Sequence, residues 1–263
     1  MTVVAGLVCS NGVVLAADTE VTHADNWKTY ESKIFPINKE TGCYFAYTGT
    51  PDFAKELADR LRSKTKAKDD PDEITTVIKQ EYQAMVGDQR KKLASDRTSA
   101  QVLVTVRRDV REPFKTKIHD YKTSLYQATE GNFFEVNDYA VLGIAEAQGT
   151  AIFKPLYSRY LSVRENVYPA IYAVQKVKRW LQGVGGETEI IEILNNDSRP
   201  FADFGKLEIK QIEDDFDFLE EQLKPLMIAL PSTMNDAYFQ ATLDRFTKAL
   251  QARHAKRLET ENS

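Results

Sequence analysis

The sequence predicts an α+β domain in which two β-sheets are each covered by a pair of helices. Short apolar, β-branched runs alternate with longer amphipathic stretches, in the order strands, two helices, strands, two helices, strand. The chain has 263 residues, of which 42% are hydrophobic, so it can bury a full core. Strand groups that alternate with helix pairs are typical of layered domains, in which each sheet buries an apolar face against helices.

The first predicted element is a β-hairpin within residues 2–18. Two apolar runs flank Asn11 and Gly12, the pair that most often forms a two-residue hairpin turn, because both turn positions require φ > 0. Both runs are continuously apolar, so we expect strands that are buried on both faces. A central strand at the start of a chain is unusual, since termini fray unless they are tied down. One explanation is that the terminus takes part in chemistry.

Two strands and two helices are predicted next, after a polar loop. In chain order they are the loop at 19–32, strands at 33–37 and 43–48, and helices that begin at Pro51 and Pro71. Thr50 can cap the first helix, and Asp70 with Glu73 matches a capping box for the second. Residues 62–70 are basic and then acidic and contain no aromatic residue. We therefore expect a solvated helix end or loop there, rather than a nucleic-acid patch.

The middle of the chain is predicted to be a β-meander followed by a second helix pair. The strands are expected at 101–106, 124–129, 132–136 and 139–143, the helices at 146–160 and 163–182, and a further strand at 188–194. Ser162 and Glu165 match a capping box. Pro169 conflicts with an uninterrupted helix, which is therefore expected to start later, with Pro169 in its first turn.

Residues 195–263 differ in composition from residues 1–194 and are predicted to be a mainly helical extension of the domain that those earlier residues form. A strand is expected at 207–212. An acidic, apolar helix is expected around Phe216 and Leu223, and a final helix after Pro231.

Charge and cysteine usage exclude several classes of protein. The net charge of −4 gives no electrostatic reason to expect nucleic acid or an anionic membrane. The longest apolar run is far shorter than the ~20 residues that span a bilayer, and the N-terminus lacks the basic segment of a signal peptide. Cys9 and Cys43 are expected to be buried, reduced thiols of a cytoplasmic protein. The three histidines are far apart in the sequence and no metal-ligand spacing surrounds them, so no metal or cofactor is predicted.

Thr2, Asp18 and Lys33 are the candidates for catalysis. If Met1 is removed, Thr2 carries a hydroxyl and a free α-amine, and an α-amine with a pKa of ~7.7–8.0 can accept the hydroxyl proton. A nearby lysine favours the alkoxide, and an aspartate keeps that lysine charged and oriented. The same residues also fit a strand-start threonine, a strand-end aspartate and a surface lysine. With Asn11–Gly12 as the turn, Thr2 and Asp18 face opposite sides, so a bulge or the strand end must bring them together.

The chain closely resembles β-type subunits of the proteasome family in three stretches: Thr2 through "GVVLAAD" at Asp18, then Lys33–Ile34, then "AYTG" ending at Gly49. The segments "SLYQATEGNFFEVNDYAVLG" and "GGETEIIEI" are similar to later strands of that family. These proteins are N-terminal-nucleophile (Ntn) hydrolases, and they include a bacterial two-component heat-shock peptidase. The resemblance covers roughly residues 2–194. It implies a four-layer αββα sandwich. The C-terminal helical extension exceeds the usual subunit length of the family, and we expect it to pack on the domain or on a neighbouring subunit.

The resemblance also implies catalytic roles and makes the chain a threonine-type peptidase. Thr2 corresponds to the nucleophile with its own α-amine as base, and Asp18 and Lys33 to the charged pair beside it. Gly49 corresponds to the glycine whose backbone N–H stabilises the tetrahedral oxyanion.

The substrate residues follow from the same resemblance. Thr22 matches a residue that pairs with the substrate backbone, and Val21 and Tyr47 match walls of the specificity pocket. The implied substrate is a peptide or an unfolded protein. The implied assembly is a homo-oligomeric ring, and an ATP-dependent unfoldase is a candidate partner.

The sequence departs from the family pattern at three supporting positions. Under the simplest alignment, Ile144, Leu181 and Val184 replace a Ser, an Asp and a Ser that hydrogen-bond around the terminal amine. A non-catalytic structural or regulatory subunit with the same fold is therefore the alternative, and an amidase for small substrates is a third reading.

Overall fold

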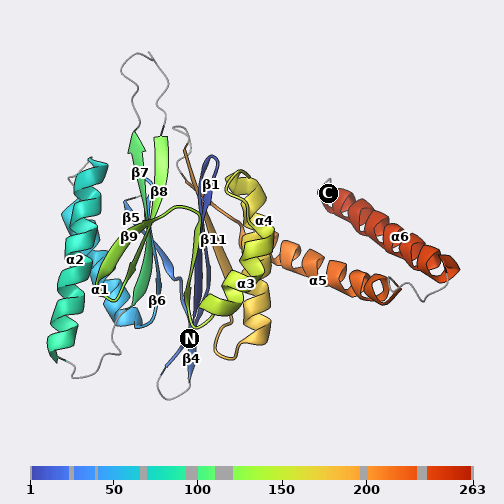
Figure 1. The fold of residues 1–263 in the computed structure, drawn as a ribbon, viewed down its shortest axis with the longest axis horizontal. Coiled ribbons are helices and arrows are strands. Elements are labelled where there is room, and N and C mark those ends of the chain that lie inside the picture. Colours follow the sequence, from blue (N-terminus) through green and yellow to red (C-terminus); the bar gives the residue numbers. More distant parts are fainter. Residues whose placement is uncertain are drawn as a thin grey trace, which may run out of the picture. The chain divides into compact units, whose positions relative to one another are not determined.

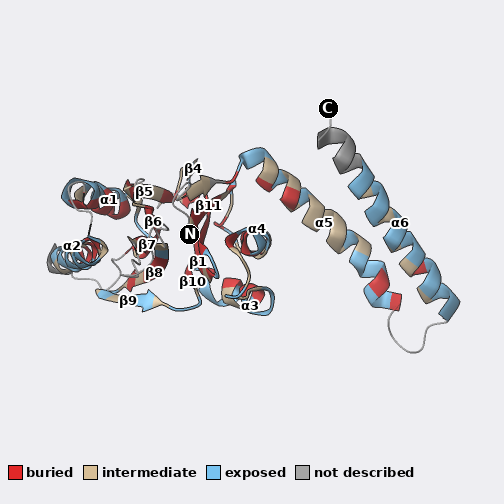
Figure 2. Ribbon diagram, turned by 90° about the horizontal axis from the view of Figure 1, so that it is seen from above, coloured by how far each residue is buried: buried red, intermediate tan, exposed pale blue. Residues whose placement is uncertain are grey.

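Two five-stranded sheets lie face to face between two helix pairs in the computed structural model of the chain (Figures 1 and 2). The structure describes residues 2–23, 27–38, 41–65, 70–92, 100–109, 121–195, 201–229 and 236–261. Figure 2 shows the layers edge on, with α1 and α2 outside one sheet and α3 and α4 outside the other. The predicted four-layer αββα class is therefore confirmed.

The first sheet contains the N-terminal hairpin at its centre. Its order is β10 (Tyr139–Gly143), β1 (Val3–Cys9), β2 (Gly12–Asp18), β11 (Thr188–Leu194) and β12 (Phe201–Asp203). All of its pairings are antiparallel. Because β10 belongs to this sheet, the predicted meander ends one strand earlier than expected.

The second sheet is antiparallel throughout and its strands are adjacent in chain order, with the helices at 51–65 and 71–92 inserted between its second and third strands. Its order is β5 (Ile34–Asn38), β6 (Cys43–Thr48), β7 (Gln101–Asp109), β8 (Tyr121–Thr129) and β9 (Asn132–Val136). A small separate hairpin joins β3 (Glu20–Thr22) to β4 (Lys28–Tyr30), within the segment predicted to be a loop. The loop prediction was wrong there because these short strands are not apolar runs and carry no strand periodicity.

Among the described residues, four helices cover the sheets and two form the extension. They are α1 (Pro51–Thr65), α2 (Pro71–Lys92), α3 (Glu146–Leu156), α4 (Val163–Trp180), α5 (Lys206–Ala229) and α6 (Asp236–Glu261). Ser162 and Glu165 form the predicted capping box at the start of α4. Pro169 lies inside this helix rather than in its first turn, because the box fixes the helix start at Val163. Residues 66–69 of the charged segment lie outside the described residues.

Apolar layers on both faces of the second sheet form much of the core. One fills the space between the sheets and includes Val4, Leu15 and Leu103, and the other lies between the second sheet and the helices α1 and α2. A Cβ at Gly6 of β1 would lie 2.8 Å from Leu125 and 2.9 Å from Leu103. The absence of a side chain there lets the sheets approach closely.

The hairpin turn differs by one residue from the prediction. Cys9 pairs with Gly12, so the two turn residues are Ser10 and Asn11. Gly12 is instead required by packing, since a Cβ there would lie 2.0 Å from the carbonyl oxygen of Ile193 in β11. The Asn11 side chain accepts a hydrogen bond from Val163 N at 2.8 Å, so it helps to fix the start of α4.

The chain divides into two compact units, residues 1–209 and residues 210–263. The segment predicted as a strand at 207–212 is helical and belongs to α5. Ile209 and Ile212 are buried while Leu207 is exposed, so the buried positions are three residues apart, as in a helix. In the second unit, Arg253 Nε donates to Asp215 Oδ1 at 2.8 Å and joins α6 to α5. No described helix is long and apolar enough to cross a membrane.

Candidate active site

A fully buried ion pair lies where β2 ends and β5 is about to begin. Lys33 Nζ is 2.9 Å from Asp18 Oδ1, and neither side chain is exposed. Lys33 Nζ also donates to the carbonyl oxygen of Glu20 at 2.6 Å. Among the described residues, these two acceptors use two of the three ammonium N–H bonds. The third is left for a further acceptor, such as a hydroxyl or an oxyanion.

The Asp18 carboxylate is satisfied by four donors. Its Oδ1 accepts from Val3 N at 2.9 Å and from Lys33 Nζ, and its Oδ2 accepts from Glu20 N and Gly185 N, both at 3.2 Å. A buried carboxylate is tolerated when its lone pairs are occupied in this way. The four bonds hold the carboxylate in one orientation and therefore hold Lys33 as well.

Asp18 Oδ1 connects this ion pair to Thr2. It accepts from both Val3 N and Lys33 Nζ, so the amide that follows Thr2 and the ammonium are at most two hydrogen-bond lengths apart. Thr2 is 8% exposed and precedes β1, which begins at Val3. Thr2 therefore lies just outside the strand in which the alternation of faces holds.

Burial shifts both pKa values of the pair. Burial lowers the pKa of the Lys33 ammonium, and the attraction of Asp18 opposes that shift. Burial likewise raises the pKa of the Asp18 carboxyl, against the attraction of Lys33 and the backbone N–H donors. A lysine whose pKa is lowered exchanges a proton with a neighbouring hydroxyl more readily than an exposed lysine does.

Gly49 follows β6, whose residues are all buried, and is itself exposed with φ +95°. Its neighbour Thr48 lies close to the start of β1 through Gly143, the last residue of β10. A Cβ at Gly143 would lie 2.1 Å from the carbonyl oxygen of Thr2 and 3.3 Å from the methyl group of Thr48. Thr2 and the residue before Gly49 therefore pack against the same glycine.

The structure places the predicted substrate-binding residues on β3 and β6. Val21 is buried in β3 and Thr22 is half-buried at the end of that strand. Tyr47 is buried in β6, its N donates to Lys33 O at 3.2 Å, and its hydroxyl donates to Glu31 at 3.4 Å. Tyr47 thus lies beside Lys33, which directly precedes β5.

The three departures from the family pattern provide no polar side chain near the terminus. Ile144 is 54% exposed, Leu181 is half-buried and Val184 is buried. Sequence reasoning missed Gly185, whose backbone N–H binds Asp18. The glycine-rich run 183–186 was the signal available in the sequence.

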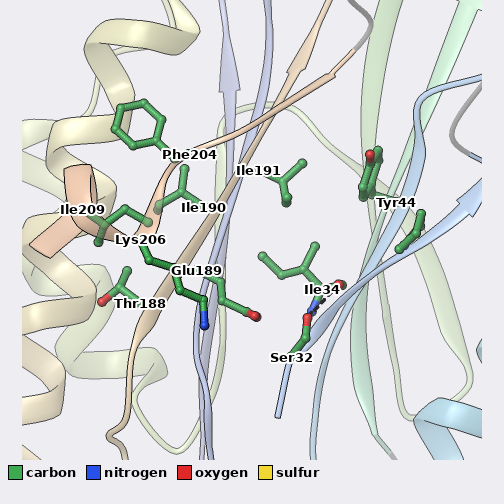
Figure 3. Close-up of a pocket in the computed structure, with 11 residues that line it drawn as sticks. Ser32, Ile34, Tyr44, Thr188, Glu189, Ile190, Ile191, Phe204, Lys206 and Ile209 are labelled. Carbon is green, nitrogen blue, oxygen red and sulfur yellow. Dashed lines mark hydrogen bonds between the residues drawn. The ribbon is translucent and has the colours of Figure 1, made fainter. Parts of the chain in front are cut away.

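A cavity of about 330 Å³ lies beside this site and does not include Thr2 or Asp18. Figure 3 shows Glu189 and Lys206 extending toward it from one side, opposite Ser32 and Ile34. It borders the site through Glu189, whose Oε2 accepts from Lys33 N at 3.1 Å. Burial raises the pKa of the Glu189 carboxyl. Within the described part of the chain, no three His, Cys, Asp or Glu residues are grouped to hold a metal ion.

Comparisons with known proteins agree with this architecture. A family model described as "Proteasome subunit" matches residues 2–193. The fold is similar to that of Anbu (ancestral beta-subunit) from Yersinia bercovieri, with 14% sequence identity, a TM-score of 0.70, and 88% of this chain and 98% of that chain covered. A mutant of Anbu from Hyphomicrobium sp. strain MC1 has 12% identity, a TM-score of 0.64, and coverage of 84% and 96%. No curated protein sequence matches the chain.

Proposed function

The chain belongs to the proteasome subunit family, and from this premise we propose that it is a threonine-type peptidase, with Thr2 as nucleophile after Met1 is removed. One observation carries the proposal. Asp18 Oδ1 bonds both Lys33 Nζ and the amide of Val3, so a buried cation is held beside the residue that carries the candidate hydroxyl. The alternative interpretation of Lys33 as a surface lysine does not hold, because its side chain is fully buried.

The proposed reaction is an acyl transfer followed by hydrolysis. The Thr2 hydroxyl oxygen attacks the scissile carbonyl carbon, while the free α-amine of Thr2 accepts the hydroxyl proton. The remaining N–H bond of Lys33 stabilises charge on the attacking oxygen, and the Gly49 N–H binds the oxyanion. The amine then protonates the leaving nitrogen, the C–N bond breaks, and an ester to Thr2 remains. Water attacks this ester, the C–O bond breaks, and the carboxylic acid product and the Thr2 hydroxyl are restored.

The substrate would be an extended peptide or an unfolded protein segment. Thr22 lies at the end of β3, where an extended backbone can pair with it, and the resemblance makes Val21 and Tyr47 walls of the specificity pocket. Subunits of this family form oligomeric rings, and we propose the same for this chain, with an ATP-dependent unfoldase as a candidate partner. Residues 195–263 would pack on the outside of the domain or on a neighbouring subunit.

A non-catalytic subunit is the second candidate, and one observation favours it. Ile144, Leu181 and Val184 replace the hydroxyls and carboxylate that the family places around the terminal amine. Without them, these three positions supply no polar side chain that could orient the amine.

Intact mass and covalent labelling of the purified protein test the proposal. We expect the mass of the chain without Met1, modification of Thr2 by a peptide epoxyketone, and turnover of fluorogenic peptides. Thr2→Ala should abolish labelling and turnover, whereas Thr2→Ser keeps the hydroxyl and the amine and should retain both. Retention of Met1, or failure of the wild-type protein to be labelled, would leave the non-catalytic subunit as the function. Turnover of small amides without turnover of peptides would identify an amidase.

A further inference from the structure

We propose that Gln101 is a positioning residue, which fixes the end of β6 that leads to Gly49 against the strand that supports Thr2. This inference rests on the function proposed above. It assigns a role to a residue that no sequence motif singles out.

The Gln101 side chain joins the two sheets at the end of the domain where Thr2 lies. Gln101 is the first residue of β7 and pairs with Thr48, the last residue of β6. Its Oε1 accepts from Thr48 Oγ1 at 3.4 Å and from Gly143 N at 3.1 Å. Thr48 belongs to the second sheet and Gly143 to the first. One oxygen atom therefore connects the two layers, which Figure 2 shows edge on.

The orientation of the Gln101 amide follows from its partners. A backbone N–H can only donate, so the group that faces Gly143 must be the oxygen. The nitrogen then points the other way and donates to Thr129 Oγ1 at 3.3 Å. Both ends of the amide are satisfied, so the side chain is held in one rotamer.

The position of this contact gives it a catalytic consequence. Gly143 packs against both the carbonyl oxygen of Thr2 and the methyl group of Thr48. The oxyanion donor Gly49 directly follows Thr48. The separation between the nucleophile and the oxyanion donor therefore depends on how the end of β6 sits against β10, and Gln101 bonds to both. Preorganisation of this kind affects the transition state more than substrate binding.

Steady-state kinetics of Gln101→Met test the proposal in the processed, assembled protein. Methionine has a similar length but no amide oxygen, so Gly143 N and Thr48 Oγ1 lose their acceptor. We expect kcat for a fluorogenic peptide to fall by about tenfold to a hundredfold, because small displacements of reacting groups have effects of this size. KM should stay within about threefold, since a positioning defect acts mainly on the transition state.

Gln83→Met is the matched control. Gln83 is exposed, and the one hydrogen bond of its side chain within the described residues goes to the carbonyl oxygen of Gly131. Equal kcat values for Gln101→Met and Gln83→Met would overturn the proposal.

Two further measurements keep the inference separable from the proposed function and from folding. Hydrogen exchange at the Gly143 amide should accelerate in Gln101→Met whether or not the protein is a peptidase, and unchanged protection would overturn the inference. If Thr2 of the wild-type protein is not labelled by the epoxyketone, only the proposed function is refuted. If Gln101→Met does not fold, Thr48→Val removes one of the two donors and keeps the side-chain shape. Its kcat should fall with KM unchanged, and a wild-type kcat would refute the positioning role.

Discussion

Lys33 Nζ lies 2.9 Å from Asp18 Oδ1, and neither side chain has exposed surface. Two charges that are removed from water each lose several kcal/mol of hydration, so an ion pair of this kind seldom improves stability over apolar residues. The four donors on Asp18 reduce that penalty but do not explain why a pair is present at this position. A cation held beside Thr2 does explain it, because the proposed chemistry needs one there.

The first prediction separates the two roles of this pair. Lys33→Met should abolish peptide hydrolysis and lower the free energy of unfolding by about 3 kcal/mol, since Asp18 then remains buried without its cation. The double variant Asp18→Asn with Lys33→Met should recover part of that stability, because no unpaired charge remains, and should stay inactive. Urea unfolding and a fluorogenic peptide assay measure the two effects.

An exposed lysine provides the control for Lys33→Met. Lys55 Nζ lies 2.6 Å from Glu31, with side-chain exposures of 49% and 28%. Lys55→Met should change the free energy of unfolding by no more than about 1 kcal/mol. If the two substitutions lower the free energy of unfolding by similar amounts, burial of Lys33 does not increase the cost of removing its ammonium. Hydrolysis by the double variant would remove the ammonium from the mechanism.

The second prediction concerns the glycine on which Thr2 rests. Gly143 has φ +97°, and a Cβ there would lie 2.1 Å from the carbonyl oxygen of Thr2. Gly143→Ala should therefore destabilise the fold by about 1–3 kcal/mol through backbone strain alone. It should also slow the labelling of Thr2 by at least about tenfold, because the clash displaces the nucleophile. Thermal unfolding and the labelling rate are the readouts.

Gly87→Ala is the matched control for Gly143→Ala. Gly87 lies in α2, and a Cβ there would meet no atom within 4 Å. Alanine is the better helix former, so this substitution should raise the free energy of unfolding by up to about 1 kcal/mol. A Gly143→Ala protein that unfolds and reacts like Gly87→Ala would refute the packing argument.

The layered fold was predictable because it depends on periodicity and on strong local signals. Apolar runs predicted the central strands, and Ser162 with Glu165 marked the start of α4. The exceptions came from contacts between distant segments. Gly12 appeared to be a turn residue, but it is a glycine because β11 approaches it closely. The segment at 207–212 carries apolar residues at spacings that fit both a strand and a helix, and only burial distinguished the two.

The site was predictable only in part, for a related reason. Thr2, Asp18 and Lys33 could be proposed from residue type and family resemblance, and the ion pair between Asp18 and Lys33 is present. The backbone donors of Asp18 and the role of Gln101 could not be inferred, because backbone N–H groups leave no signature in a sequence. Gln101 lies 42 residues before its partner Gly143, and only the stacking of the two sheets brings them together.

The third prediction concerns the two cysteines. Cys9 and Cys43 are free and buried, and burial raises the pKa of each thiol to about 12. The thiolate is the reactive form, so neither residue should react with N-ethylmaleimide at neutral pH while the protein is folded. Both should react completely in concentrated urea, as read by intact mass. Rapid modification of the native protein would show that one of the strands that carry these residues opens readily.

The last prediction is a pH dependence of stability that originates at Glu189. Burial raises the pKa of this carboxyl in the folded protein above its ordinary value, so the folded state binds the proton more tightly than the unfolded state does. Its contribution to stability is fully present below the ordinary pKa and is lost as the pH rises through the raised value. Glu189→Gln is neutral throughout and can still accept from Lys33 N. The free energy of unfolding of the wild type should therefore fall relative to that of this variant across that pH window. Above the window, the difference between the two should stay constant.

Glu135→Gln, at an exposed position on β9, removes the same charge and is the matched control. Urea unfolding at several pH values measures all three proteins, and superimposable profiles for the two variants would refute a role for burial of Glu189.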